Sequence, residues 1–274
     1  LKKNKKTFLL SARGPAKKIF QNLFKNIKFQ PLSNLLNNSN EIITGTGFTE
    51  FEINAIDLAN KRNIKTIAIL DHWVNYRERF YIKDTLILPN EIWVCDKFAF
   101  EEAIKVFDKN IIKKIRNPYI QRIKSEFFKF KNQSIKENKA KKILYVGSPV
   151  SINAKKKFND ELYFGYSEKD AINFFFKKIK ETKYKKYIIC FRPHPSEKLK
   201  NYSWVTGKYA DNFKIIFSKN DSLIHDIFSS NLIVGCNSMA LVISAIACNK
   251  TTINAIPFKS IKNNIPYKKV SLLR

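Results

Sequence analysis

The chain has 274 residues, of which 51 are basic and 23 are acidic, so its formal net charge is +28. Its 44% hydrophobic and 14% aromatic content is typical of a folded protein and excludes a disordered basic tail. The basic residues are dispersed and accompany no nucleic-acid-binding motif, which argues against specific binding of nucleic acid. A solvated lysine surface is the plainest interpretation of the charge. Attraction to anionic lipid headgroups or to a charged glycan is the alternative.

The spacing of the cysteines and the length of the apolar runs indicate the cellular compartment in which the protein is expected. The four cysteines are widely spaced without a CxxC pair, so neither a zinc site nor a disulfide framework is predicted. No segment has the pattern of a signal peptide, and no apolar run reaches the roughly 20 residues of a membrane span. We therefore expect a cytoplasmic protein, and peripheral attachment to the inner membrane is an alternative that the charge leaves open.

In the first half of the chain, strand-like apolar runs alternate with amphipathic helical runs. The expected strands cover residues 7–11, 41–44, 66–70, 91–95 and 113–115. The expected helices cover residues 16–24, 50–62 and 99–107. Residues 123–142 are rich in Lys, Asn and Gln and are expected to form a helix and a linker that ends this series.

The second half of the chain repeats the alternation. The expected strands cover residues 143–146, 187–191, 214–217, 232–234 and 251–254, and the expected helices cover residues 168–182, 222–228 and a stretch from Met239 onward. Such alternation predicts parallel sheets with helices on both faces. We expect an α/β fold with two Rossmann-like domains, residues 1–140 and 141–274, facing each other across a cleft. Ligands of such sheets bind beyond the carboxyl ends of the strands.

The sharpest polar motif follows the strand at residues 187–191 and reads R-P-H-P, residues 192–195. The two prolines stiffen the turn and fix where the two polar side chains point. Arg192 offers a planar fork for phosphate oxygens, and His194 can donate a hydrogen bond to a phosphate or protonate a leaving group. A solvent-exposed turn without a ligand is the structural alternative.

Two further strand ends in the second half have polar groups that suit an anion. Gly235 allows close approach of a ligand to the backbone, and Asn237 or Ser238 can cap the helix that begins at Met239. The N–H groups and the dipole at such a helix start favour a phosphate. Ser148, within Gly-Ser-Pro at residues 147–149, closes the first strand of this series and is a further donor-binding candidate. A plain N-cap and a structural turn are the alternatives.

The first half carries candidates for proton transfer and for acceptor binding. Residues 45–52 contain two glycines around a tight turn and a T-x-x-E capping box, Thr49 to Glu52, which leaves Glu50 free to point into the cleft. Asp71 follows a strongly apolar strand and is a plausible general base. The neighbouring side chains that suit a sugar or an anionic group are His72, Trp73, Tyr76, Arg77 and Arg79.

Together, the R-P-H-P motif and the later strand–G-C-N-S–helix segment resemble GT-B type nucleotide-sugar glycosyltransferases. His194-Pro195 resembles the His-Pro motif of bacterial sialyltransferases and polysialyltransferases, whose His contacts the CMP phosphate, and Ser238 matches the position of their phosphate-binding serine motif. Residues 235–247 are also similar to glycerophosphotransferases and sugar-nucleotide 2-epimerases. The resemblance covers residues 140–257. Those sialyltransferases take their base from an acidic-acidic-Gly tripeptide that this sequence lacks, so Glu50 and Asp71 are candidates by location only.

The resemblance and the polar clusters together predict a metal-independent glycosyltransferase of surface-polysaccharide or lipopolysaccharide assembly, with no cofactor. Its donor would be a nucleotide-activated sugar, CMP-sugars slightly preferred, and its acceptor a glycan or a lipid-linked glycan. Arg192, His194 and the helix end at Ser238 would hold the donor phosphate, and Asp71 or Glu50 would accept the proton of the acceptor hydroxyl. A non-hydrolysing sugar-nucleotide 2-epimerase and a non-catalytic polyanion-binding protein are the alternatives.

Overall fold

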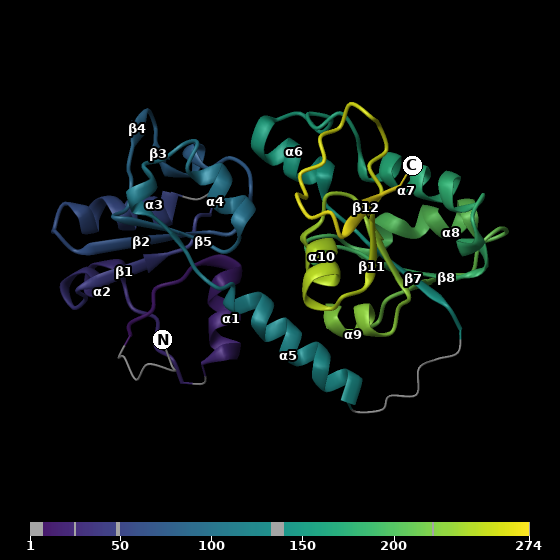
Figure 1. Ribbon diagram of the computed structural model, residues 1–274, viewed down its shortest axis with the longest axis horizontal. Helices are drawn as coiled ribbons and strands as arrows, with labels where there is room; N and C mark the ends of the chain where they lie inside the picture. Colours follow the sequence, from purple (N-terminus) through teal and green to yellow (C-terminus); the bar gives the residue numbers. More distant parts are fainter. Residues whose placement is uncertain (1–7, 25, 48–49, 133–139, 221, 274) are drawn as a thin grey trace. The chain divides into compact units, whose positions relative to one another are not determined.

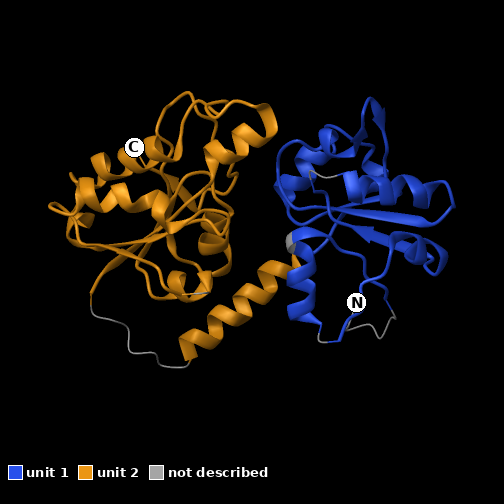
Figure 2. Cartoon of the chain, turned by 180° about the vertical axis from the view of Figure 1, so that it is seen from behind, with its two compact units in different colours: residues 1–116 blue, residues 117–274 orange. Residues whose placement is uncertain are grey.

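A computed structural model describes residues 8–24, 26–47, 50–132, 140–220 and 222–273 of the chain (Figure 1). The chain divides into two compact units, residues 1–116 and residues 117–274 (Figure 2). We call them unit 1 and unit 2. The sequence predicted a boundary at residues 140 and 141, whereas the structure assigns the helix before that point, α5 (Pro118–Asn132), to unit 2.

Unit 1 is built on a four-stranded parallel sheet in the order β1-β2-β5-β6. Its strands are β1 (Glu41–Thr44), β2 (Lys65–Leu70), β5 (Glu91–Val94) and β6 (Ile112–Lys114). The helical segments are α1 (Gly14–Leu23), α2 (Leu32–Asn37), α3 (Glu50–Asn60), η2 (Arg77–Phe80), α4 (Lys97–Ala103) and η3 (Lys109–Ile111), and a short hairpin joins β3 (Tyr81–Ile82) to β4 (Thr85–Leu86).

The centre of the unit 1 sheet follows directly from the sequence. β2 reads K-T-I-A-I-L, and its residues 66–68 and 70 are buried, so both faces of the strand are covered, as a central parallel strand requires. Phe80 is fully buried and packs edge-on against Phe107, with ring centroids 5.5 Å apart. The strand expected at residues 7–11 is wrong for its described part, where Leu10 forms only an isolated bridge with Phe29.

Unit 2 contains a six-stranded parallel sheet in the order β12-β11-β10-β7-β8-β9. The strands are β7 (Lys142–Val146), β8 (Ile188–Arg192), β9 (Ile215–Phe217), β10 (Leu232–Gly235), β11 (Thr251–Asn254) and β12 (Val270–Leu272). The first three strands extend the sheet in one direction from β7, and the next three extend it in the other. This is the doubly wound order of dinucleotide-binding folds, whose topological switch point lies between its first and fourth strands. Here those strands are β7 and β10.

The helices of unit 2 cover this sheet and begin where the sequence supplies caps. They are α5, α6 (Val150–Phe158), α7 (Glu168–Ile179), η4 (Lys183–Lys186), η5 (Leu199–Tyr202), α8 (Ser203–Tyr209), α9 (Leu223–Phe228), α10 (Met239–Val242) and a π-helical turn, η6 (Ile243–Ala247). Ser167 and Asp170 form a capping box at the start of α7, which buries Phe175 and Phe176 in the core of unit 2.

The helix α5 packs against α9 and η6, which explains its place in unit 2. The rings of Phe127 and Phe130 lie 5.7 and 6.0 Å from the ring of Phe228 on α9. Within the described ranges, no helix combines the length and the apolar character needed to cross a membrane.

Candidate functional site

The switch point of unit 2 lies between the loops that follow β7 and β10. Val146 and Gly235, the last residues of these strands, are partners in the parallel register. Beyond them, the Ser148 hydroxyl donates to the carbonyl oxygen of Cys236 at 3.0 Å and so ties the two loops together. A Cβ on Gly235 would lie 2.6 Å from Val146 Cγ2 and 3.0 Å from its carbonyl oxygen. The neighbouring strand therefore explains this glycine without any ligand.

The R-P-H-P turn after β8 lies against the β7 loop. The N–H of Gly147 donates to the carbonyl of Arg192 at 2.8 Å, and a Cβ on Gly147 would lie 3.2 Å from the backbone nitrogen of His194. His194 is exposed, as a residue that meets a ligand must be. The loops after β7, β8 and β10 thus share one edge of one sheet, with the β7 loop in the middle. The R-P-H-P turn and the helix start at Met239 therefore lie at the same edge of the unit 2 sheet, on either side of the β7 loop, and their sharing of one anion pocket stays a prediction.

The imidazole of His194 is held from one side by its own turn. Its Nδ1 accepts a hydrogen bond from the Ser196 backbone N–H at 3.2 Å and lies 2.7 Å from the Ser196 hydroxyl oxygen. A neutral ring whose Nδ1 accepts from the backbone carries its proton on Nε2. Nε2–H is therefore the group that His194 can offer to a bound anion.

The carboxylate of Glu197 holds the same turn, and the sequence analysis did not single it out. Its Oε2 accepts from the His194 backbone N–H at 3.2 Å and from the Tyr202 hydroxyl at 2.7 Å. Burial, and then the Glu197 carboxylate, raise the pKa of Tyr202, so its hydroxyl stays a donor at neutral pH. The spacing H-x-x-E, which brings residue 197 back to the backbone of residue 194, was the available sequence signal.

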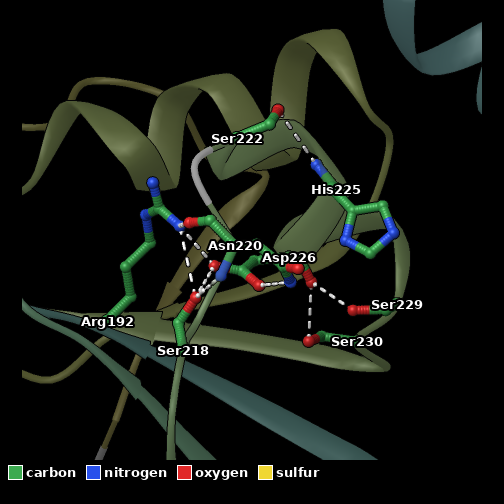
Figure 3. Close-up of polar contacts among 8 residues, drawn as sticks. All are labelled: Arg192, Ser218, Asn220, Ser222, His225, Asp226, Ser229 and Ser230. Carbon is green, nitrogen blue, oxygen red and sulfur yellow. Dashed lines mark hydrogen bonds and ion pairs between the residues drawn. The ribbon is translucent and has the colours of Figure 1, made fainter.

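The Arg192 side chain is held by hydrogen bonds to residues that follow β9 and to a carboxylate of α9 (Figure 3). Its Nη1 donates to Asp226 Oδ2 and to the Asn220 carbonyl, both at 2.6 Å, and to the Ser218 hydroxyl at 3.3 Å. Asp226 is only 2% exposed and also accepts from Ser218 and Asn220. The guanidinium thus fixes the start of the R-P-H-P turn to α9, and a direct contact between Arg192 and a donor phosphate stays a prediction.

The helix start after β10 is capped by Ser238, whose hydroxyl accepts from the Ala240 N–H at 3.3 Å. Asn237 instead adopts a left-handed conformation, with φ of 46°, and binds other protein groups. Its Oδ1 accepts from Asn254 Nδ2 at 3.0 Å and from the Asn264 N–H at 3.3 Å. Asn237 therefore shapes the loop through β11 and the segment after it, while Ser238 provides the cap that the sequence assigned to either residue.

Cys236, which lies between Gly235 and Asn237, carries an unreactive thiol. Its Sγ lies 3.4 Å from the Tyr166 hydroxyl, and burial raises its pKa to about 11. A thiol with such a pKa is protonated at neutral pH and is a poor nucleophile. Because Cys236 is only 3% exposed, a ligand at the switch point would meet the backbone of this loop rather than the cysteine side chain.

The equivalent edge of unit 1 brings Asp71 close to the loop after β1. Arg79 donates through Nη1 to the carbonyl and hydroxyl oxygens of Thr46 and forms an ion pair with Asp71 Oδ1 at 3.3 Å. The Asp71 side chain is 76% exposed, while that of Arg79 is only 6% exposed. A buried cation thus supports a carboxylate that stays accessible to solvent.

The acceptor-binding candidates of unit 1 differ in accessibility. His72 and Trp73 are half-buried, and Arg77 is exposed. The Trp73 backbone N–H donates to His72 Nδ1 at 3.0 Å, and its indole N–H donates to Asp96 at 3.0 Å. Burial lowers the pKa of the His72 imidazole, while the neighbouring Asp71 carboxylate opposes that shift.

Tyr76 departs from the expected role of a stacking platform. It is only 4% exposed because it packs in the core of unit 1 beside Phe80, and this burial raises the pKa of its hydroxyl. Its ring faces are therefore covered by protein and not by solvent.

Glu50 is the exposed first residue of α3. Thr49, the other half of the expected capping box, lies outside the described residues. The Glu52 carboxylate turns back toward the β1 loop, where its Oε1 would lie 3.1 Å from a Cβ placed on Gly47. Glu50 and Asp71 thus follow adjacent parallel strands, β1 and β2, and lie toward the same edge of the sheet.

No protein-family model matches the sequence, and no curated protein matches it either. Among solved structures, the chain is similar to UDP-GlcNAc 2-epimerase from Neisseria meningitidis bound to UDP-GlcNAc, with a TM-score of 0.52 and 12% sequence identity. That superposition covers 82% of this chain and 67% of the epimerase chain. The chain has a GT-B type fold. The predicted α/β class with two Rossmann-like units is thereby confirmed.

A second solved structure with similarity is MurG from Acinetobacter baumannii, with a TM-score of 0.47 and 9% identity. It covers 93% of this chain and 70% of the MurG chain. The similarity to the epimerase, at 12% identity, shows a shared fold alone, and the function has to be argued from the site.

Proposed function

We propose that the protein is a metal-independent glycosyltransferase that binds a nucleotide-activated sugar at the switch point of unit 2. The observation that carries the proposal is the meeting of three loops at one sheet edge, with His194 exposed and a capped helix start at Ser238. Ligands of doubly wound sheets bind at this point. CMP-activated sugars are the preferred donors because of the resemblance of residues 194–195 and Ser238 to the sialyltransferase motifs.

The donor phosphate would be stabilised as it leaves. When the bond between the anomeric carbon and the phosphate oxygen breaks, negative charge grows on that oxygen. The Nε2–H of His194 and the first N–H groups of the helix after Ser238 are donors that suit this charge. Ser148, Gly235 and Asn237 would shape the loops that present these donors, and Arg192 would hold the R-P-H-P turn or contact the phosphate itself.

The acceptor hydroxyl would lose its proton to a carboxylate of unit 1 as its oxygen attacks the anomeric carbon. Asp71 is the better candidate because Arg79 orients it while its side chain stays exposed, and Glu50 is the second candidate. His72, Trp73 and Arg77 would hold the acceptor, which we propose to be a surface-polysaccharide or lipopolysaccharide glycan, free or lipid-linked. The reaction would take place in the cytoplasm, at the surface of the inner membrane.

A sugar-nucleotide 2-epimerase is the second candidate, because one similar solved structure, with a TM-score of 0.52, is described as such an enzyme. The two activities differ in their need for an acceptor. A transferase consumes the labelled sugar nucleotide fully only when acceptor glycan is present, whereas an epimerase releases the epimeric sugar without acceptor.

The test combines nucleotide binding with turnover. A thermal-shift screen of CMP, CDP, UDP, GDP, ADP and inorganic phosphate should show stabilisation by one nucleotide class well above that by phosphate. His194→Ala should lower transfer by about 10²–10³-fold, the usual effect of removing one oxyanion donor, while leaving the unfolding temperature unchanged. Lys186→Ala, in the exposed η4 before β8, is the matched control. Equal stabilisation by phosphate and by every nucleotide would support a polyanion-binding protein instead, and full activity of His194→Ala would remove His194 from the mechanism.

A further inference from the structure

The segment that contains α6 and the loop after it exposes several large apolar side chains within a short stretch of the chain. Ile152 is 46% exposed, Leu162 59%, Tyr163 54% and Phe164 41%. We call residues 152–164 the α6 surface. Scattered exposed apolar residues are ordinary, but a contiguous group of them usually marks an interaction surface.

The structure explains why these side chains point outward. Along α6, Val150 and Ala154 are buried and Phe158 is half-buried, so the helix uses the i, i+4, i+8 face to pack on unit 2. Ile152 and the lysines that follow lie off this face. The helix ends at Asn159 in a left-handed conformation, and Asp160 then accepts a hydrogen bond from the Leu162 N–H at 2.8 Å.

The aromatic part of the α6 surface is ordered by ring stacking. Tyr163 stacks on Phe158 with ring centroids 3.5 Å apart, and Phe164 meets both rings edge-on at 5.6 and 5.8 Å. These rings therefore hold a fixed arrangement without being covered. A partner that buries them loses little side-chain entropy, because the rings are already ordered.

Exposed lysines accompany this apolar group in the same segment and in the segment beside it. Lys155, Lys156 and Lys157 are exposed at the end of α6. A second segment, residues 258–262, lies beside the loop, because Ile261 Cδ1 would be 3.1 Å from a Cβ on Gly165. It adds Lys259, Lys262 and the 47% exposed Phe258. The α6 helix and the yellow C-terminal segment lie at the same end of unit 2 (Figure 1).

The two segments together contain five lysines against two carboxylates, Asp160 and Glu161. A surface that combines apolar and aromatic side chains with an excess of lysines complements a layer that is negative on the outside and apolar beneath. The headgroup region of an anionic bilayer is such a layer: aromatic rings sit among the headgroups, and each nearby lysine strengthens binding. A protein partner would have to supply a matching acidic and apolar face, so the lysine excess favours lipid.

We propose that the α6 surface docks unit 2 on an anionic lipid bilayer. This specifies the membrane contact within the proposed function and does not depend on the catalytic assignment. The α6 surface begins directly after the β7 loop at the switch point, so docking through it would hold the donor-binding edge of unit 2 near lipid-linked acceptors.

The test is co-sedimentation of the full chain with vesicles of phosphatidylcholine alone and of phosphatidylcholine mixed with phosphatidylglycerol. Two double variants address the two parts of the surface: Ile152→Ser with Leu162→Ser, and Lys155→Glu with Lys156→Glu. Matched controls are Phe128→Ser, an exposed apolar residue on α5, and Lys185→Glu with Lys186→Glu in η4. Circular dichroism and nucleotide binding on each variant verify folding and keep this test separate from the catalytic proposal.

The wild-type protein should bind the anionic vesicles in preference to the neutral ones. Each α6 double variant should weaken that binding roughly tenfold or more, and each control should bind as the wild type does. Failure of the wild type to bind anionic vesicles would overturn the proposal. So would an equal loss in the η4 lysine control, which would indicate attraction through total charge. Self-association that Ile152→Ser with Leu162→Ser abolishes, in a protein that ignores vesicles, would assign the surface to contact between protein chains.

Discussion

At the scale of single residues, the buried pair of Arg192 and Asp226 is the contact on which the candidate site depends most. Removing one partner of a buried ion pair leaves the other charge without compensation, at a cost of about 3–5 kcal/mol. Asp226→Ala should therefore lower the free energy of unfolding by this amount in urea titrations. Glu102→Ala, which breaks the exposed pair with Lys105, is the control and should cost less than about 1 kcal/mol. Similar losses in both variants would contradict the assigned role of the network.

Gly235 tests whether close packing or a ligand requires glycine at the end of β10. Its substitution by Ala would press a Cβ against Val146, including the carbonyl oxygen of its backbone. We expect Gly235→Ala to destabilise the protein by about 1–3 kcal/mol in the absence of nucleotide. Gly207→Ala is the matched control, because it lies in α8 with no atom within 4 Å of the new Cβ. That change should stabilise the protein by about 0.5–1 kcal/mol, and thermal unfolding of both variants measures the contrast.

The half-buried His72 imidazole should make the folded protein less stable as the pH falls. Burial lowers its pKa from the ordinary 6.5, so the unfolded chain binds the proton more readily than the folded chain does. As the pH falls below 6.5, the folded state loses stability until the pH passes the lowered pKa. His72→Gln should reduce this loss. The loss is measured as the unfolding free energy at a pH above 6.5 minus that at a pH below 6.5. An unchanged difference would show that His72 does not contribute.

The residue scale is also where sequence reasoning was least complete. His194, Ser148 and Ser238 lie at the predicted edge because each follows an apolar strand directly, and strand ends of a parallel sheet meet. Asp226 and Glu197 were missed because their importance comes from tertiary partners. Tyr76 was misjudged because an aromatic residue in a polar segment can turn inward, as its neighbour Phe80 does.

At the scale of secondary-structure elements, α5 illustrates what a periodic pattern leaves open. The sequence predicted a helix in this region, but an amphipathic pattern does not say which partner covers the apolar face. The strands with long apolar runs were predicted well. The strand β12 was not predicted, because its sequence is only V-S-L and its formation depends on pairing with β11. The α6 helix escaped prediction because only Val150, Ala154 and Phe158 form its inner face, while the large apolar Ile152 lies off that face.

The placement of α5 in unit 2 makes a prediction about three phenylalanines on one helix. Phe127 and Phe130 contact Phe228, while the adjacent Phe128 is 61% exposed. Phe127→Ala or Phe130→Ala should therefore lower the unfolding free energy by about 1–3 kcal/mol, as expected for half-buried rings. Phe128→Ala, the neighbouring control, should change it by less than about 0.5 kcal/mol. Equal effects at all three positions in urea titrations would contradict the packing of α5 on α9.

At the scale of the whole molecule, the strand order of unit 2 directs attention to one edge. The alternation of strands and helices was readable from the sequence, and it predicted the α/β class and two Rossmann-like units. It did not reveal that β10 returns to the far side of β7, because strand order depends on crossover connections rather than on local pattern. That order places the switch point between the β7 and β10 loops, so the proposed donor site follows from topology together with His194 and Ser238.

Hydrogen–deuterium exchange of the full chain, with and without the nucleotide that stabilises it most, tests the central claim most directly. Bound ligand should protect the backbone amides of the loops after β7, β8 and β10, residues 147–151, 193–197 and 236–241, more than any other part of unit 2. Protection confined to unit 1, or to the opposite edge of the unit 2 sheet, would contradict the placement of the donor site.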